Sequence, residues 1–217
     1  MNNMISNRLK SLVKYVDKKD NVIDIGCDHA LLDIYLVLNN NIDNALVSDI
    51  SKNALNQGIE NIKKYNLENS ISTRCGSGLE VLNDKDIIDT IIISGMGTNT
   101  ILEILNNKYL NKINKMIIQS NKDYELLRRK IVKLGFKISN EECIVDNDKV
   151  YINIIFVRGK EEYSDVEYKY GLNTMLNKEL YYNHLINRNN SIVNKLNNSI
   201  KKNELLEEIE FIKINLL

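Results

Sequence analysis

The stretch NVIDIGCDH, Asn21 to His29, joins a short apolar run to an acidic residue, a glycine and the start of a helical pattern. Such a unit is typical of the first strand and helix of a parallel sheet. Similar apolar runs recur along the chain at 45–50 (ALVSDI), 71–75 (ISTRC), 89–94 (DTIIIS) and 115–119 (KMIIQ). Helical patterns separate them, at 30–38, 52–65, 99–105 and 123–134. The alternation predicts an α/β, Rossmann-like domain whose mostly parallel sheet is covered on both faces.

The flanking segments complete the predicted organisation. Residues 4–15 carry apolar side chains at helical spacing, and 136–145 with 150–157 read as an antiparallel hairpin around the turn-like Asp146, Asn147 and Asp148. From 166 to 217 apolar residues recur every three or four positions, which predicts helices packed as a hairpin. We therefore expect a main domain over 1–160 and a helical region over 161–217.

Bulk properties narrow the class of protein. The 217 residues hold 29 basic and 29 acidic side chains, so the net charge of zero gives no general support to nucleic-acid binding. The three cysteines, Cys27, Cys75 and Cys143, form no CxxC pair, which favours neither a disulfide framework nor a metal site. No apolar run is long enough for a signal peptide or a membrane span. We expect a cytoplasmic protein that needs neither metal nor membrane.

The loop DIGCDH, Asp24 to His29, is the first candidate site, because ligands bind at the carboxyl ends of parallel strands. It lacks the GxGxxG of dinucleotide binders, and an acidic residue followed by one glycine is closer to an S-adenosylmethionine site. Asp49, at the end of the second apolar run, is placed to accept hydrogen bonds from both ribose hydroxyls; its alternative role is to cap the next helix, which Ser51 can also do. Residues 76–78 (GSG) either wrap the adenine end of the cofactor or form a plain turn.

The fourth apolar run ends in SGMGTNT, Ser94 to Thr100, where two glycines bring backbone toward the same edge of the sheet. The pattern alone is also compatible with tight packing of a strand on a helix. The (Asn/Asp)-Pro-Pro-aromatic motif of many methyltransferases that act on exocyclic amines is missing here. Its absence argues against that class of acceptor.

The ordered set DIGCDHALL, VSDIS, GSGLEVL, ISGMGTNTI, IIQSN and a helical tail resembles the bacterial tRNA (adenine-22-N1)-methyltransferases, the TrmK-like family, over nearly the whole chain. The resemblance implies a class I methyltransferase domain with a C-terminal coiled-coil-like domain, methylating adenine N1 in the D-arm region of tRNA. The implied cofactor is S-adenosyl-L-methionine. Its expected contacts are Asp24, Gly26, Cys27, Asp49, Ile50, Gly76, Ser77, Gly78, Ser94, Gly95, Met96 and Gly97.

The chain departs from the family pattern at three positions. Thr98 replaces a common Gly, Ser120 replaces a common Pro, and Cys27 stands where Ser or Thr is usual. These departures leave cofactor binding intact as an expectation and bear on the shape of the acceptor pocket.

Candidate catalytic residues follow from the chemistry of adenine N1, which has a lone pair and needs no strong base. Methylation leaves a positive charge on the ring, which the carboxylate of Asp28 can stabilise, while His29 can hydrogen-bond the ring or relay a proton. A helix cap is the alternative role for this pair. Asn121, after the fifth run, either contacts the base edge or caps its loop. His184, in the helical tail, is interpreted as a packed or surface residue.

The target base must leave its stack to be methylated, so we expect phosphate contacts near the site. The candidates are Arg8, Lys10 and Lys14 in the first helix, and Arg128 and Arg129 in the fifth, with a solvated helix face as the alternative for each cluster. Two other functions remain open: a methyltransferase of a small molecule or protein, and a non-catalytic nucleotide- or RNA-binding module.

Overall fold

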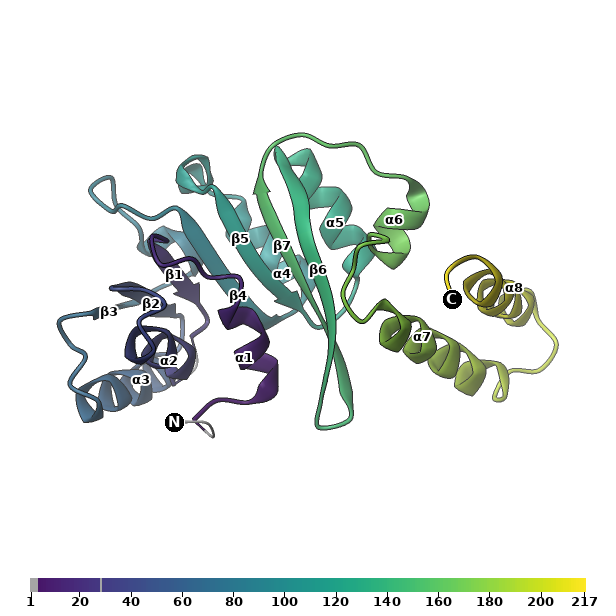
Figure 1. The fold of residues 1–217 in the computed structure, drawn as a ribbon, viewed down its shortest axis with the longest axis horizontal. Helices are drawn as coiled ribbons and strands as arrows, with labels where there is room; N and C mark the ends of the chain where they lie inside the picture. Colours follow the sequence, from purple (N-terminus) through teal and green to yellow (C-terminus); the bar gives the residue numbers. More distant parts are fainter. Residues whose placement is uncertain (1–3, 28) are drawn as a thin grey trace.

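A seven-stranded mixed sheet forms the centre of the computed structural model, which describes residues 4–27 and 29–217 (Figure 1). The strand order is β3-β2-β1-β4-β5-β7-β6; the first five strands of the chain run parallel, and β7 pairs antiparallel with both β5 and β6. The strands are β1 Val22–Ile25, β2 Ala45–Asp49, β3 Ile71–Cys75, β4 Thr90–Met96, β5 Lys115–Ser120, β6 Phe136–Asp146 and β7 Lys149–Arg158. The predicted Rossmann-like sheet is thereby confirmed.

The hairpin β6–β7 turns where the sequence predicts it. Asn147 and Asp148 both have positive φ, 49° and 59°, as the two central residues of a tight hairpin turn require. Short polar side chains tolerate this backbone conformation, which explains why Asn and Asp occupy the turn without a glycine.

Helices cover both faces of the sheet. One face packs against α1 (Asn7–Val13), α2 (Leu31–Leu38) and α3 (Lys52–Lys64) through an aliphatic cluster. The other face packs against α4 (Thr98–Leu105) and α5 (Tyr124–Lys133), with the short 3-10 helices η1 (Gly78–Val81) and η2 (Lys108–Lys112). The helix α1 is shorter than predicted, because the Oγ of Ser6 accepts a hydrogen bond from the Leu9 N–H and fixes its start.

Three helices follow the sheet, as predicted for the end of the chain. They are α6 (Asp165–Tyr170), α7 (Lys178–Val193) and α8 (Ile200–Asn215). Figure 1 shows α7 and α8 side by side, beyond the β6 edge of the sheet. Among the described residues, no helix combines the length and the apolar character needed to cross a membrane.

The strand order reverses between β1 and β4. The chain runs outward from β1 to β2 and β3, and then returns to place β4 on the other side of β1. In open parallel sheets, the crevice at such a point, beyond the carboxyl ends of the strands, is where ligands bind. The residues that follow β1 and those that end β4 therefore lie where a ligand is expected to bind.

Candidate active site

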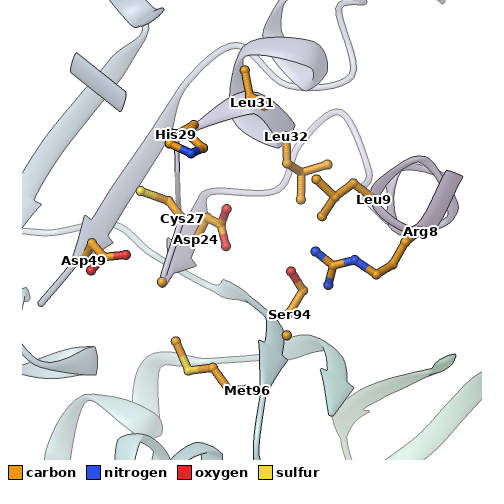
Figure 2. A pocket seen from close by; sticks show the side chains of 12 residues that line it. Arg8, Leu9, Asp24, Cys27, His29, Leu31, Leu32, Asp49, Ser94 and Met96 are labelled. Carbon is orange, nitrogen blue, oxygen red and sulfur yellow. The ribbon is translucent and has the colours of Figure 1, made fainter. Parts of the chain in front are cut away.

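Two adjoining cavities open at the point where the strand order reverses. The first has a volume of about 350 Å³ and is lined from α1, the loop after β1, the start of α2 and the end of β4 (Figure 2). The second, of about 410 Å³, is lined from the ends of β2 and β3, from η1 and from α4. Gly26, Asp49 and Met96 line both. The two cavities therefore form one trough that crosses the carboxyl ends of the strands.

Gly26 gives the floor of the trough its shape. Its φ is +75°, and a Cβ at this position would lie 2.1 Å from the Cε of Met96. The N–H groups of Gly26 and Cys27 both donate to the carbonyl of Ser48, at 2.8 and 3.2 Å, which ties the loop to β2. The backbone conformation therefore favours a glycine, and a Cβ would also force the end of the flexible Met96 side chain to move.

Asp49 occupies the junction of the two cavities. Its Oδ1 accepts a hydrogen bond of 2.7 Å from the Ser51 N–H. The cap of α3 is Ser51, whose Oγ accepts from the N–H of Ala54. The alternative role of Asp49 as the helix cap is therefore wrong, and its carboxylate faces the trough.

Charges of both signs face the first cavity. Asp24 is buried on β1, and burial raises the pKa of its carboxyl to about 7, with a further rise from the negative charge of Asp49 and an opposing effect of Arg8. Figure 2 shows Arg8 reaching in from α1 toward the same space as Asp24. The guanidinium of Arg8 donates from Nη1 to Gln119 Oε1 at 2.9 Å. The first cavity thus presents the carboxyl of Asp24 and the cationic guanidinium of Arg8, which together suit a zwitterionic group.

The end of β4 carries a bulge. The register of β4 against β5 shifts between Ser94 and Met96, around Gly95, whose φ is +80°. Asn121 holds the bulge in place: its backbone N–H donates to the Met96 carbonyl at 2.9 Å, and its Nδ2 donates to the Gly95 carbonyl at 2.7 Å. The GMG segment therefore presents a fixed stretch of backbone beside the first cavity.

Two of the family departures compensate for each other. The hydroxyls of Thr98 and Ser120 lie 2.9 Å apart, and Thr98 Oγ1 also donates to the Lys122 carbonyl at 2.6 Å. Both side chains are buried. Together they fasten the start of α4 to the loop after β5.

The second cavity contains the predicted adenine end of the site. Ile50, Gly76, Ser77 and Gly78 line it, and the Ile50 side chain is 74% exposed. The sequence interpretation missed its other wall, formed by Thr100, Glu103 and Ile104 of α4 and by Asn106 and Asn107. A sequence signal for this wall existed, because the helix predicted at 99–105 directly follows the SGMG segment at the end of the fourth strand. Gly97, predicted as a cofactor contact, lines neither cavity and is the N-cap residue of α4.

The predicted catalytic residues fare differently. His29 lines the first cavity, and its backbone carbonyl accepts a hydrogen bond from Asn61 Nδ2 at 3.0 Å. Asp28 lies outside the described residues. Asn121 is exposed just past β5 and does not line the first cavity. Cys27 is buried beside the cavity, and burial raises the pKa of its thiol, which keeps the thiol neutral.

The predicted phosphate contacts require one correction. Arg128 is fully buried, with its Nε donating to Glu141 Oε1 at 2.6 Å and its Nη1 to the Tyr168 carbonyl at 2.9 Å. The prediction that it contacts tRNA is wrong, because a side chain enclosed in this way cannot reach a phosphate.

The other basic candidates stand near the surface. Arg8 lines the first cavity rather than a solvated helix face, and Lys10 is half-buried on α1. Lys14 is exposed and pairs with Glu142 at 2.6 Å. Arg129 pairs with both Glu125 and Asp165, so its charge is largely offset. Their contact with RNA stays a prediction.

A third hollow, of about 410 Å³, separates α5 and the start of β7 from the C-terminal helices. Asn121 forms part of its rim, Tyr124 and Tyr181 meet edge to face with ring centroids 6.0 Å apart, and the exposed His184 and Arg188 line it from α7. The interpretation of His184 as a surface residue is consistent with this position. In residues 4–27 and 29–217, no group of three or more His, Cys, Asp or Glu is arranged to hold a metal ion.

The chain is similar in sequence and in structure to known methyltransferases. The family described as "Methyltransferase domain" matches residues 5–155. The tRNA (adenine(22)-N(1))-methyltransferase of Bacillus subtilis (strain 168) is 30% identical over 161 residues, which cover 73% of this chain and 67% of that protein. Among solved structures, M. capricolum TrmK with S-adenosyl-homocysteine is 35% identical, with a TM-score of 0.86 and 97% of both chains covered. A putative tRNA (m1A22) methyltransferase of Streptococcus pneumoniae with S-adenosyl-L-methionine is 26% identical, with a TM-score of 0.87, covering 97% of this chain and 98% of that one.

Proposed function

Because this chain belongs to the family of bacterial tRNA (adenine(22)-N(1))-methyltransferases, we propose that it transfers a methyl group from S-adenosyl-L-methionine to N1 of an adenine in tRNA, at position 22. The observation that carries the proposal is the trough that joins the ends of β1, β2, β3 and β4. The cytoplasm, where tRNA is found, is the expected place of action.

The trough suits the cofactor in size and in chemistry. The carboxylate of Asp49 lies at its centre, where it would accept hydrogen bonds from ribose hydroxyls. Ile50 and the 76–78 segment would contact the adenine ring in the second cavity. Asp24 and Arg8 would hold the amino and carboxylate groups of the methionine portion in the first. Gly26 lines both cavities, and the absence of a side chain there keeps the trough open beside Met96.

When bound, the cofactor supplies an electrophilic methyl group, and this chain's residues align and shield the acceptor. Asn121 fixes the backbone of the β4 bulge, against which we place the adenine. His29 is positioned in the first cavity to hydrogen-bond the ring. Asp28 is proposed to stabilise the positive charge that develops on the ring, as the sequence suggests.

We further propose that residues 161–217 form a helical region that extends the tRNA-binding surface beyond the main domain of residues 1–160. The third hollow supports this idea, because Asn121 forms part of its rim and also contacts the bulge beside the first cavity. The exposed guanidinium of Arg188 is suited to a phosphate of the RNA, and the partly buried ring of Tyr124 lies in the same hollow. Lys10, Lys14 and Arg129 are proposed as outlying phosphate contacts.

A nucleoside analysis of the product tests the function. Incubation of the protein with labelled S-adenosyl-L-methionine and unmodified tRNA is expected to yield N1-methyladenosine at position 22. Replacing that adenine with guanine in the transcript should abolish incorporation. Label in another nucleoside, a protein or a small molecule would overturn the acceptor assignment, and failure to bind the cofactor would favour a non-catalytic module.

Substitutions in the third hollow test the proposed tRNA surface. Arg188→Ala is expected to raise the KM for tRNA by about 5-fold and to weaken its dependence on salt, because one phosphate contact is lost. Lys178→Ala is the matched control, since Lys178 is a cation on the same helix that does not line the hollow. Steady-state kinetics at several salt concentrations provide the measurement. Equal KM values for the two variants would show that the hollow does not contact tRNA.

A further inference from the structure

Asp33 is a buried acid that the proposed mechanism leaves without a role. It lies in the first turn of α2, inside the apolar sequence LLDIYLVL, and its side chain is fully buried. In the described part of the chain, no donor forms a hydrogen bond with either of its carboxylate oxygens. An ionised carboxyl in such a place is strongly disfavoured, so the residue calls for a physical explanation.

The group that faces Asp33 is the carboxyl of Asp24, which lines the first cavity. Two carboxylates offer only acceptors to each other, so they form a hydrogen bond only when one of them holds a proton. Their contact raises the pKa of Asp33, in addition to the larger rise caused by burial, and it lowers the pKa of Asp24. The shared proton therefore resides on Asp33, and Asp24 is the member of the pair that ionises.

Within residues 4–27 and 29–217, the other charged and titratable groups around Asp24 come from three other elements. Arg8 of α1 lowers its pKa, Asp49 at the end of β2 raises it, and Cys27 in the loop after β1 is kept neutral by burial. His29 lines the same cavity. The balance leaves Asp24 with a pKa of about 7, so it is part-protonated at neutral pH.

We propose that Asp33 is a positioning residue for the cofactor: its protonated carboxyl donates to Asp24 and holds the Asp24 carboxylate toward the cationic amino group of the ligand. This inference rests on the proposed use of S-adenosyl-L-methionine. The proposed role of Asp33 involves hydrogen bonding only, with no covalent step between Asp33 and the ligand. Binding of the cation favours the ionised form of Asp24, so the proton that Asp24 carries near neutral pH is released to solvent.

Calorimetric binding of S-adenosyl-L-homocysteine, a probe that cannot transfer a methyl group, measures this linkage. The dissociation constant is expected to fall by about 20-fold between pH 5.5 and pH 7.5, with a midpoint near 7, as Asp24 ionises. Titrations at pH 6.5 in two buffers of different ionisation enthalpy should detect a proton released on binding. Asp24→Asn removes the titrating group itself, and should abolish the dependence of the dissociation constant on pH.

Two substitutions of Asp33 separate its proposed role from a packing role. Asp33→Asn replaces the protonated carboxyl with another neutral donor toward Asp24, so the midpoint and the affinity at pH 5.5 should stay near the parental values. Asp33→Leu removes the donor, so the midpoint should move above 7 and the affinity at pH 7.5 should fall by about 10-fold. Thermal unfolding of both variants without ligand verifies that each is folded before binding is measured.

The outcomes are distinct. A parental midpoint in Asp33→Asn together with a raised midpoint in Asp33→Leu supports the proposal. Parental midpoints in both variants, with changes in stability only, would show that Asp33 merely fills space. If the parent protein binds the probe with an affinity that does not depend on pH, the inference fails while the proposed function stands. If the parent does not bind the probe at any pH, the proposed function fails and the inference fails with it.

Discussion

Replacing Asp49 with asparagine is expected to weaken binding of S-adenosyl-L-homocysteine by about 100-fold, since a charged acceptor of two hydrogen bonds becomes a neutral amide. The position magnifies the effect, because Asp49 lines both cavities of the trough. Gly26 and Met96, the other described residues that line both, carry no charge that could replace it. Its Oδ1 already accepts from the Ser51 N–H, which fixes the carboxylate before the ligand arrives. Isothermal titration calorimetry at pH 7.5 measures the change.

Ser51→Ala provides the matched control for this result. Ser51 caps α3 immediately beside Asp49, and it lines neither cavity. Loss of the cap should lower the free energy of unfolding by about 1 kcal/mol while leaving the dissociation constant within about 3-fold of the parent value. Parental affinity in Asp49→Asn, or an equal loss in both variants, would remove Asp49 from the ribose site.

Replacing Arg128 with methionine is expected to lower the free energy of unfolding by about 3–5 kcal/mol, because the carboxylate of Glu141 is left buried without its counter-charge. Both side chains of the ion pair are fully buried. Glu141 Oε2 also accepts a 2.6 Å hydrogen bond from the N–H of Leu172, at the connection between α6 and α7. The pair therefore joins α5 and β6 to the C-terminal helices. Urea denaturation followed by circular dichroism measures the loss.

The double variant Arg128→Met with Glu141→Leu should recover much of that loss, since no buried charge remains. Arg129→Met is the control on the same helix: its ion pairs are partly exposed and screened by solvent, so its loss should leave the free energy of unfolding nearly unchanged. A similar, small effect in Arg128→Met and Arg129→Met would contradict the importance of the buried pair.

The parts of the fold that depend on local patterns could be predicted from the sequence. Strands apolar on both faces and separated by amphipathic helices admit few arrangements, so the parallel sheet and the hairpin at Asn147 and Asp148 followed directly. Asp49 and Gly26 could be placed beside the trough for the same reason, because a strand end and a tight turn each restrict the residues that fit.

What the sequence could not reveal depends on partners far along the chain. Arg128 looks like one of several cations on a solvated helix, and its burial follows from Glu141 on another element. Asp33 looks like a polar interruption in an apolar helix, and only the packing of α2 on β1 brings it to Asp24. The hydroxyls of Thr98 and Ser120 complement each other across 22 positions, which no local pattern signals.

The attachment of α1 has a consequence for how the protein is made. Arg8 donates to Gln119, Lys14 pairs with Glu142, and Ser11 accepts from Asn153, so the first helix of the described chain is anchored by strands completed last. At translation rates of about 5–20 residues per second, roughly 7 to 30 s separate the emergence of α1 from that of β7. Until then α1, which also packs against α2, lacks these polar contacts with β5, β6 and β7. The wall of the first cavity that carries Arg8 can therefore be held in place only once β7 has emerged, after the parallel strands.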